Sequence, residues 1–505
     1  MTTLYSLSYL VIIISTLAWF FQKSRKQPTK IPKITFLASV GFFVLLFILR
    51  DGTLFQKLVI FLPREVGIFC IAVLLGHYYA EKVVKYLLVA AGLLISTQMI
   101  HFETFRPHLF SKDIQLDPKG ELLFDIKDHD QLNKIKKDLA FYKLKIRRAF
   151  PNLGHKDYSN LDEYYIIDIP DDRTDDLKEI MEKLLETEAV DYVERNEVIK
   201  LEPLKKADRD SEKMPDYGIN DLNLSELWGF KPMKIGDYYK LFIEKKINVN
   251  NTAKIAILDT GVNGDHEDLK DNFFSIDSKY DKDTLGHGTH CAGIAGAVTN
   301  NKIGIASFSY GKNIQITSIK VLNDDGSGTQ ESIIEGIILA ADRGMDVISL
   351  SLGGYSSDER QQAYEEAVQY ANKAGAIVIV AAGNDDESAT QFAPANVKGV
   401  ITVTAVDQSL DKADFSNYVN DIDMGIAAPG VDILSTFPDN KYQALSGTSM
   451  AVPYVAGLVG VMKSIKPDLD TEDVFKILEK TGIDTGSTKQ TGKFIQPYEV
   501  LMALQ

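Results

Sequence analysis

Five short and nearly continuous apolar runs in the C-terminal half constrain the fold of this chain most strongly. Segments with helical spacing separate them. The runs are KIAILD (254–259), IQITSIKVL (314–322), MDVISLSL (345–352), AIVIVAAG (376–383) and VITVTAV (400–406). Strands that are apolar on both faces, with helices between them, predict a parallel sheet covered by helices on each side. Active sites in such folds form at the carboxyl ends of the strands.

Three polar residues occur where a predicted strand or turn meets a predicted helix. Asp259 ends a strand in ILDTG, His287 lies in GHGTHCAGIAG, and Ser449 lies in SGTSMAVPYVAG. A hydroxyl nucleophile needs a base within hydrogen-bond reach, and the base needs a carboxylate that fixes its tautomer. A helix beginning at Ser449 would add N–H groups that favour developing negative charge. The three residues therefore predict nucleophilic catalysis.

The segments ILDTGV, GHGTHCAGI, SLSLGG, VAAGN and GTSMA, in this order, resemble the subtilisin-like serine proteases (subtilases, peptidase S8) from about residue 216 to 505. The resemblance implies a subtilisin-like doubly wound α/β fold and a serine endopeptidase that cleaves proteins or peptides through an acyl-enzyme. In that family Asp259 would orient His287, and His287 would act as general base and then acid. Ser449 would attack the carbonyl, and Asn384 would donate its amide to the oxyanion.

The resemblance also implies where a peptide substrate would bind. The matching residues form two peptide-binding edges and one pocket wall: Gly326, Ser327 and Gly328; Ser351, Leu352 and Gly353; and Ala381, Ala382 and Gly383. Pro394, after Ala393, matches a position where the family commonly has a cis proline. Phe392 stands where many members have glycine, so we expect a shorter specificity pocket that favours small residues.

A structural calcium site is the one cofactor that the resemblance implies, and none is implied for catalysis. Asp268 and Asn301 match family ligands, and the carbonyls of Thr299, Ile303 and Ile305 would complete an oxygen shell of the kind that Ca²⁺ prefers. The alternative is a hydrogen-bonded loop without metal.

Two alternatives to an active subtilase remain at this point. Val452-Pro453-Tyr454 replaces the family's Ser-Pro-His, which would suit an inactive, membrane-tethered binding module. The paired DTG motifs at Asp259 and Asp484 are typical of aspartic proteases, in which two carboxylates share a proton. The second motif follows EKTG rather than an apolar strand, and the intact Asp–His–Ser set argues against both alternatives.

The remaining metal-ligating and thiol side chains predict structural roles. His290, three residues after His287, lacks the H-E-x-x-H spacing of a zinc protease. Cys291 is expected to be a small buried residue beside the base rather than a nucleophile. Cys70 is the other cysteine of the chain, so a disulfide scaffold and a four-cysteine zinc site are excluded.

A small α+β segment precedes the subtilase-like part. From Glu121 the apolar pattern predicts the order βαββαβ, with its first helix over the amphipathic stretch from Gln131 to Phe141, which suggests a ferredoxin-like domain. Over residues 120–202 it resembles the inhibitor-I9-like prodomain of the family, which implies an intramolecular inhibitor and folding aid. We therefore expect a prodomain at 104–204, an exposed linker with the processing site at 205–215, and a catalytic domain at 216–505.

The first 103 residues predict a membrane region. Four apolar segments, Leu4–Phe21, Ile34–Leu49, Val66–Ala80 and Tyr86–Ile100, suggest four transmembrane helices. The last two are short, so a buried hairpin is the alternative for them. Seven Lys and Arg residues in the first and third loops, against three in the second, place the protease outside the cytoplasm.

The charge of the chain separates along the same boundary. The formal net charge of −15 combines +7 over residues 1–110 with −22 over the remainder. The acidic remainder argues against a nucleic-acid partner.

Overall fold

The computed structural model describes residues 115–127, 131–201, 205–206, 216–356 and 361–505. The four predicted membrane spans lie outside these residues. Within the described ranges one helix, α12 (Thr448–Ile465), is long and apolar enough to cross a membrane, and 94% of it is buried. It is the central core helix of the fold.

Residues 115–201 form a small unit with one four-stranded antiparallel sheet of order β2-β3-β1-β4. Its elements are β1 (Leu122–Ile126), α6 (Leu132–Asp138), β2 (Lys145–Arg148), β3 (Tyr164–Asp168), α7 (Leu177–Leu185) and β4 (Val190–Arg195). The chain therefore has the βαββαβ order expected from its pattern. Helix α7 buries Ile180 and Leu184, spaced by one turn, against the sheet.

The first helix of the small unit is shorter than its sequence suggests. The prediction extended it from Gln131 to Phe141, whereas α6 ends at Asp138 and a 3-10 turn follows at Ala140–Tyr142. The tighter turn buries the ring of Tyr142 and leaves Phe141 70% exposed. A pattern of apolar residues does not separate these two outcomes, because both residues are aromatic.

Residues 216–505 form a large unit around a seven-stranded sheet of order β18-β15-β14-β12-β10-β7-β8, in which every neighbouring pair is parallel. The strands are β7 (Ala253–Asp259), β8 (Ile314–Lys320), β10 (Val347–Leu350), β12 (Ile377–Ala381), β14 (Val400–Val406), β15 (Gly425–Pro429) and β18 (Lys493–Phe494). The five predicted strands are confirmed. The sequence prediction missed β15 and β18, which lie together at one side of the sheet.

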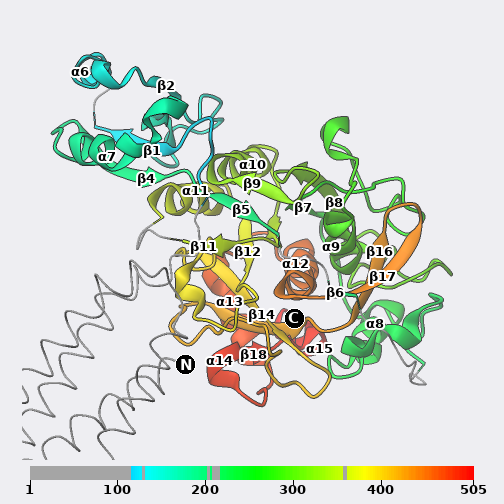
Figure 1. Ribbon diagram of the computed structural model, residues 1–505. Helices are drawn as coiled ribbons and strands as arrows, with labels where there is room; N and C mark the ends of the chain where they lie inside the picture. The colour runs from blue at the N-terminus through cyan, green and yellow to red at the C-terminus, as the bar shows by residue number, and fades with distance from the viewer. Residues whose placement is uncertain (1–114, 128–130, 202–204, 207–215, 357–360) are drawn as a thin grey trace, which may run out of the picture. The chain divides into compact units, whose positions relative to one another are not determined.

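Helices cover both faces of this sheet (Figure 1). Ile255 and Ile257 of β7 face a core with α8 (Ile235–Ile243), α9 (His287–Gly296), α12, α13 (Thr471–Thr481) and α15 (Pro497–Ala503). Ala256 and Leu258 face the opposite core, which contains α10 (Gln330–Asp342) and α11 (Gln362–Lys373). Burial on both faces explains why the strands read as continuous apolar runs.

The small unit packs on α10 and α11 of the large unit (Figure 1). Glu194 of β4 is fully buried, and its carboxylate accepts bonds from the N–H groups of Gln362 and Ala363 and from Gln330 Nε2 at 3.0–3.2 Å. A carboxylate at the first turn of a helix satisfies orphan N–H groups and complements the helix dipole.

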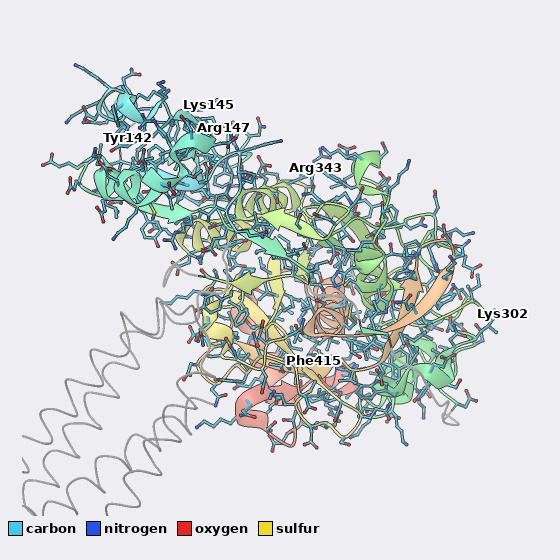
Figure 2. The ribbon with its side chains drawn as sticks, viewed as in Figure 1. Tyr142, Lys145, Arg147, Lys302, Arg343 and Phe415 are labelled. Carbon is cyan, nitrogen blue, oxygen red and sulfur yellow. The ribbon has the colours of Figure 1, made fainter. Side chains whose placement is uncertain are left out.

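A second polar contact joins the two units at β2. Arg147 forms a two-pronged ion pair with Glu331 of α10, with N–O distances of 2.5 and 2.8 Å. Figure 2 shows Arg147 on the same strand as Lys145. Lys145 pairs with Asp168 inside the small unit and is 83% exposed at its side chain.

The chain between the two units is also paired with the large unit. Strand β5 (Val198–Lys200) pairs antiparallel with β9 (Ser327–Thr329). Strand β6 (Lys205–Lys206) pairs antiparallel with β17 (Lys441–Ser446). The first two residues of the linker predicted from residue 205 therefore form a short strand paired with the large unit.

We predict that Glu194→Ala weakens docking of the small unit. Removing the carboxylate leaves buried N–H groups of α11 without a partner, which costs about 1–3 kcal/mol, or roughly a 5- to 150-fold loss in the docking equilibrium. Hydrogen exchange of the full-length chain should then accelerate in β5 and at the start of α11. Lys145→Ala is the control, since its exposed ion pair contributes little. Equal exchange in the two variants would contradict the assignment.

Candidate active site

Asp259 and His287 meet at the carboxyl end of β7. The Nδ1 atom of His287 lies 2.7 and 2.9 Å from the two carboxylate oxygens of Asp259, and both side chains are buried. His287 is the first residue of α9, and Gly288 follows it. A Cβ atom at 288 would lie 2.1 Å from the carbonyl oxygen of Gly261, so glycine permits the close approach of α9 to the loop after β7.

The buried carboxylate of Asp283, which the sequence analysis missed, stabilises the segments that carry Asp259 and His287. Asp283 accepts bonds at 2.7–2.8 Å from Thr260 Oγ1, from the N–H of Gly286, and from both the N–H and the hydroxyl of Thr289. It thereby links the loop after Asp259 to the first turn of the His287 helix. In the sequence, only its position four residues before His287 could have indicated this role, and no apolar periodicity marks that position.

The electrostatic surroundings of His287 favour its protonated form. Burial lowers the pKa of the ring, but the charge of Asp259 and its hydrogen bond raise it, and the charge of Asp283 adds to them. The net result is a pKa above the ordinary histidine value of about 6.5. An imidazolium formed here would be stabilised by two carboxylates.

Ser449 lies in the first turn of α12, 8% exposed. Its hydroxyl donates to the carbonyl of Ser351 at 3.0 Å. In return, the Ser351 hydroxyl donates to the carbonyl of Ser449 at 2.8 Å. The second bond holds the backbone of Ser449, whereas rotation about one side-chain bond can release its Oγ from the first and redirect it.

Two hydrogen bonds hold the side-chain oxygen of Asn384, and neither of them involves its amide nitrogen. The Oδ1 atom accepts bonds from the N–H and the hydroxyl of Thr448 at 2.8 and 2.9 Å. The residue lines the same cavity as Ser449 and His287. The arrangement presents an N–H donor in the cavity that Ser449 lines at the first turn of α12, and an oxyanion site needs donors of this kind.

The cavity at these residues has a volume of about 200 Å³. Four of the nine predicted substrate-binding residues line it. Leu352, Gly353, Ala381 and Gly383 line the cavity, together with Phe392, Phe415 and the small unit's Lys200 and Leu201. Figure 2 labels Phe415 in the large unit.

Ala382 does not belong with this lining set. It is fully buried in the core on the α10–α11 side, and its N–H donates to Val403 across the sheet. Residues of a strand alternate between faces, so Ala381 and Ala382 cannot both face one pocket.

Phe392 closes one side of the cavity. It is 3% exposed, and its ring packs edge-on against Tyr355 at 5.8 Å between centroids. The Ala393–Pro394 peptide bond after it is cis, as predicted. A phenyl ring at this wall fits the expected narrow pocket.

His290 and Cys291 have the structural surroundings expected of them. His290 Nε2 lies 2.9 Å from the carbonyl oxygen of Gln443. The buried Cys291 thiol donates to the carbonyl of Ser449 at 3.4 Å, and burial raises its pKa, so it stays protonated. With Asp259 and His287 it forms the one group of acidic, histidine or cysteine side chains in the described residues close enough to share a metal.

The predicted calcium ligands come from two segments that lie against each other, Asp268 after β7 and the loop 299–305. The Asp268 carboxylate accepts bonds at 2.8 Å from Asn301 Nδ2 and from the N–H of Ile305. Among the described residues, no donor bonds to the carbonyl of Thr299, Ile303 or Ile305. Free carbonyls beside a buried carboxylate form a donor set of the kind that Ca²⁺ takes.

Asp221, near the start of the large unit, is a further acidic residue against this loop, and the sequence analysis missed it. It accepts bonds from the N–H groups of Asn300 and Asn301, and burial raises its pKa. The pKa of Asp268 is raised to about 7, mainly by burial, with a contribution from the charge of Asp221. Two buried carboxylates that repel each other in this way would be stabilised by a cation.

The departures from the family motif lie in the core rather than in the cavity. Val452 is fully buried, and Tyr454 packs against Phe308 at 6.1 Å between ring centroids. The second DTG aspartate, Asp484, is exposed, whereas Asp259 is buried against His287. No carboxylate pair forms between the two motifs.

Comparison with known proteins identifies this constellation. The model of the Subtilase family matches residues 250–494. Thermitase from Thermoactinomyces vulgaris is 45% identical over 217 residues, which make up 42% of this chain and 75% of thermitase. The chain belongs to the subtilase family.

Two further relatives place this subtilase among serine proteases. Subtilisin DY from Bacillus licheniformis is 40% identical over 250 residues, which are 48% of this chain and 87% of the relative. The thermophilic serine proteinase of Bacillus sp. (strain AK1) is 46% identical over 216 residues, 42% of this chain and 52% of the relative. This subtilase is a serine endopeptidase, and both the aspartic-protease and the inactive-module alternatives are set aside.

We predict that Asp268 makes stability pH-dependent in the presence of a chelator. Its folded pKa is raised, so the protonated form favours folding. The melting temperature of the full-length chain in detergent, made inactive by Ser449→Ala, should therefore fall as the pH rises from about 4 to 7. Asp268→Asn should flatten this slope. The exposed Asp265→Asn is the matched control, and an unchanged slope in the Asp268 variant would refute the prediction.

Proposed function

We propose that Asp259, His287 and Ser449 form the catalytic triad of this serine endopeptidase. The observation that carries the proposal is the buried Asp259–His287 pair, at 2.7 Å, beside a serine that lines the same cavity. Neutral His287 would take the proton of Ser449 Oγ as that oxygen attacks the peptide carbonyl. Asp259 would hold the ring in the tautomer with its proton on Nδ1 and stabilise the imidazolium.

The oxyanion formed by the attack would be stabilised by Asn384 Nδ2 and by the N–H of Ser449 at the start of α12. Because the bonds to Thr448 fix the amide of Asn384 beforehand, little reorganisation is needed as charge develops. His287 would then return the proton to the leaving amine. Water would release the acyl chain from Ser449 through the same groups.

The small unit would serve as a prodomain that blocks this cleft until it is cut away. Strand β5 pairs with the edge at Gly328, and the N–H of Leu201 donates to the carbonyl of Gly326 at 3.0 Å. Pairing with an exposed sheet edge is the mode by which an extended substrate would bind. Lys205 and Lys206 pair with β17 next to Ser449, so the chain is held on both sides of the nucleophile. This supports self-cleavage between residues 202 and 215.

Calcium would bind at the loop of Asp221, Asp268 and Asn301 and supply charge neutralisation there, with no part in the reaction. Two observations support this assignment. The raised pKa values of Asp221 and Asp268 are one, and the other is that no donor among the described residues bonds to the carbonyls of Thr299, Ile303 and Ile305. The membrane region 1–103 would anchor the precursor with the protease outside the cytoplasm, on the strength of its apolar segments and loop charges.

Self-processing tests the triad directly. Wild-type full-length chain should yield a C-terminal fragment that begins between residues 202 and 215, identified by N-terminal sequencing. Ser449→Ala and His287→Ala should remain intact, because neither can form an acyl-enzyme. Ser409→Ala, which removes the hydroxyl of an exposed serine outside the site, is the control and should still be processed. Identical migration of wild type and the Ser449 variant would rule out self-cleavage.

The pH dependence of peptide hydrolysis tests the assignment of His287 as the base. Since only the neutral ring accepts the serine proton, kcat/KM should rise with pH through a pKa above about 6.5. Asp283→Asn removes a charge that raises this pKa and should therefore move the acidic limb to lower pH. Asp265→Asn, an exposed change of equal charge, should leave the limb in place. If the acidic limb keeps its position in the Asp283→Asn enzyme, the charge of Asp283 does not raise the pKa of His287.

A further inference from the structure

The segment of the small unit that enters the cleft alternates between apolar and basic side chains. Ile199 is 5% exposed and belongs to the same buried cluster as Leu352. Lys200 is exposed. Leu201 returns to the cleft, where its side chain lies with that of Leu285 against Gly326. A strand alternates its side chains between faces, so the triplet presents apolar, basic and apolar groups in turn.

The middle residue of this triplet faces a carboxylate. Lys200 is directly opposite Ser327 in the β5–β9 pair, and residues directly opposite share one face of the sheet. The carboxylate of Asp325 accepts bonds from the N–H of Ser327 at 3.0 Å and from its hydroxyl at 2.6 Å. The bond to the hydroxyl places Asp325 on the face to which Lys200 projects.

Asp324 and Asp325 are adjacent carboxylates, and they differ in whether a cation of the described residues pairs with them. Asp324, beside it, accepts a bond from Lys320 at 2.9 Å. No cation of the described part of the chain lies within ion-pair distance of Asp325. Bonds from Ser327 lower its pKa most, and the charge of Lys200 lowers it further. A carboxylate fixed in its ionised state at the rim of a peptide-binding edge is a recognition group for a basic side chain.

We propose that this protease prefers substrates with an apolar–basic–apolar triplet on the N-terminal side of the cut, and that Asp325 selects the basic residue. The inference rests on the proposed function, because it takes the strand 199–201 as a copy of the bound substrate. Ile199 and Leu201 define the apolar positions, and the backbone pairing with Gly326 and Gly328 sets the register.

The test uses two internally quenched peptides that differ only at the middle position, Ile-Lys-Leu-Ala and Ile-Glu-Leu-Ala, each with the same flanks. Full-length enzyme in detergent, after self-processing, should cleave the lysine peptide about 3- to 10-fold faster in kcat/KM. An exposed charge pair gives an effect of this size, and 1 M NaCl should reduce it. Mass spectrometry of the products verifies the cleavage position.

Variants at the recognition group separate a local contact from the overall charge. Asp325→Lys should invert the preference. Asp325→Asn, which can still accept the Ser327 bonds, should bring the ratio close to one. Asp265→Lys makes the same change in net charge at an exposed site elsewhere and should keep the wild-type ratio. An equal shift in the Asp325→Lys and Asp265→Lys enzymes would overturn the assignment of Asp325.

Failure of this proposal is distinguishable from failure of the proposed function. Equal cleavage of both peptides by active wild-type enzyme overturns the triplet preference and leaves the triad intact. Loss of hydrolysis of both peptides and of casein by the processed wild type overturns the triad and this inference with it.

Discussion

The close packing of α12 on the parallel sheet and on α9 is the constraint on which the rest of the site depends. A Cβ atom at Gly457 would lie 2.6 Å from the carbonyl oxygen of Ala295 in α9, so the two helices approach to backbone contact. Gly460 permits a similar approach of α12 to Ile255 of β7. Ser449 is the second residue of α12, and His287 is the first residue of α9. Their relative placement is therefore set by the core and not by flexible loops.

The arrangement of the groups that the sequence predicts follows from general rules of α/β folds. Asp259 could be found because it ends a buried apolar strand, and Ser449 because a glycine turn precedes an apolar helix. Strands β15 and β18 escaped prediction, since one combines glycine and proline with short apolar residues and the other has only two residues. β15 and β18 form strands because they pair with neighbouring strands, and no local sequence pattern indicates this pairing.

The residues that sequence reasoning missed share a physical cause. Asp283 and Asp221 act through carboxylate bonds to backbone N–H groups in loops, at positions that have neither periodicity nor an apolar context. The pairing of Lys205–Lys206 with β17 joins segments more than two hundred residues apart. Ala382 shows the converse error, in which a motif was carried over as a block although strand geometry turns its members to opposite faces.

The docking of Asp221 has a consequence for the order of events during maturation. Asp221 already bonds the backbone of Asn300 and Asn301 while Lys205–Lys206 remain paired with β17 in the uncut chain. The contacts of Asp221 are thus formed while the small unit is still joined to the large unit. If the small unit is removed as proposed, cutting would unblock a large unit that already has these contacts, and the rate at which activity appears would be governed by dissociation of the small unit rather than by refolding of the large one.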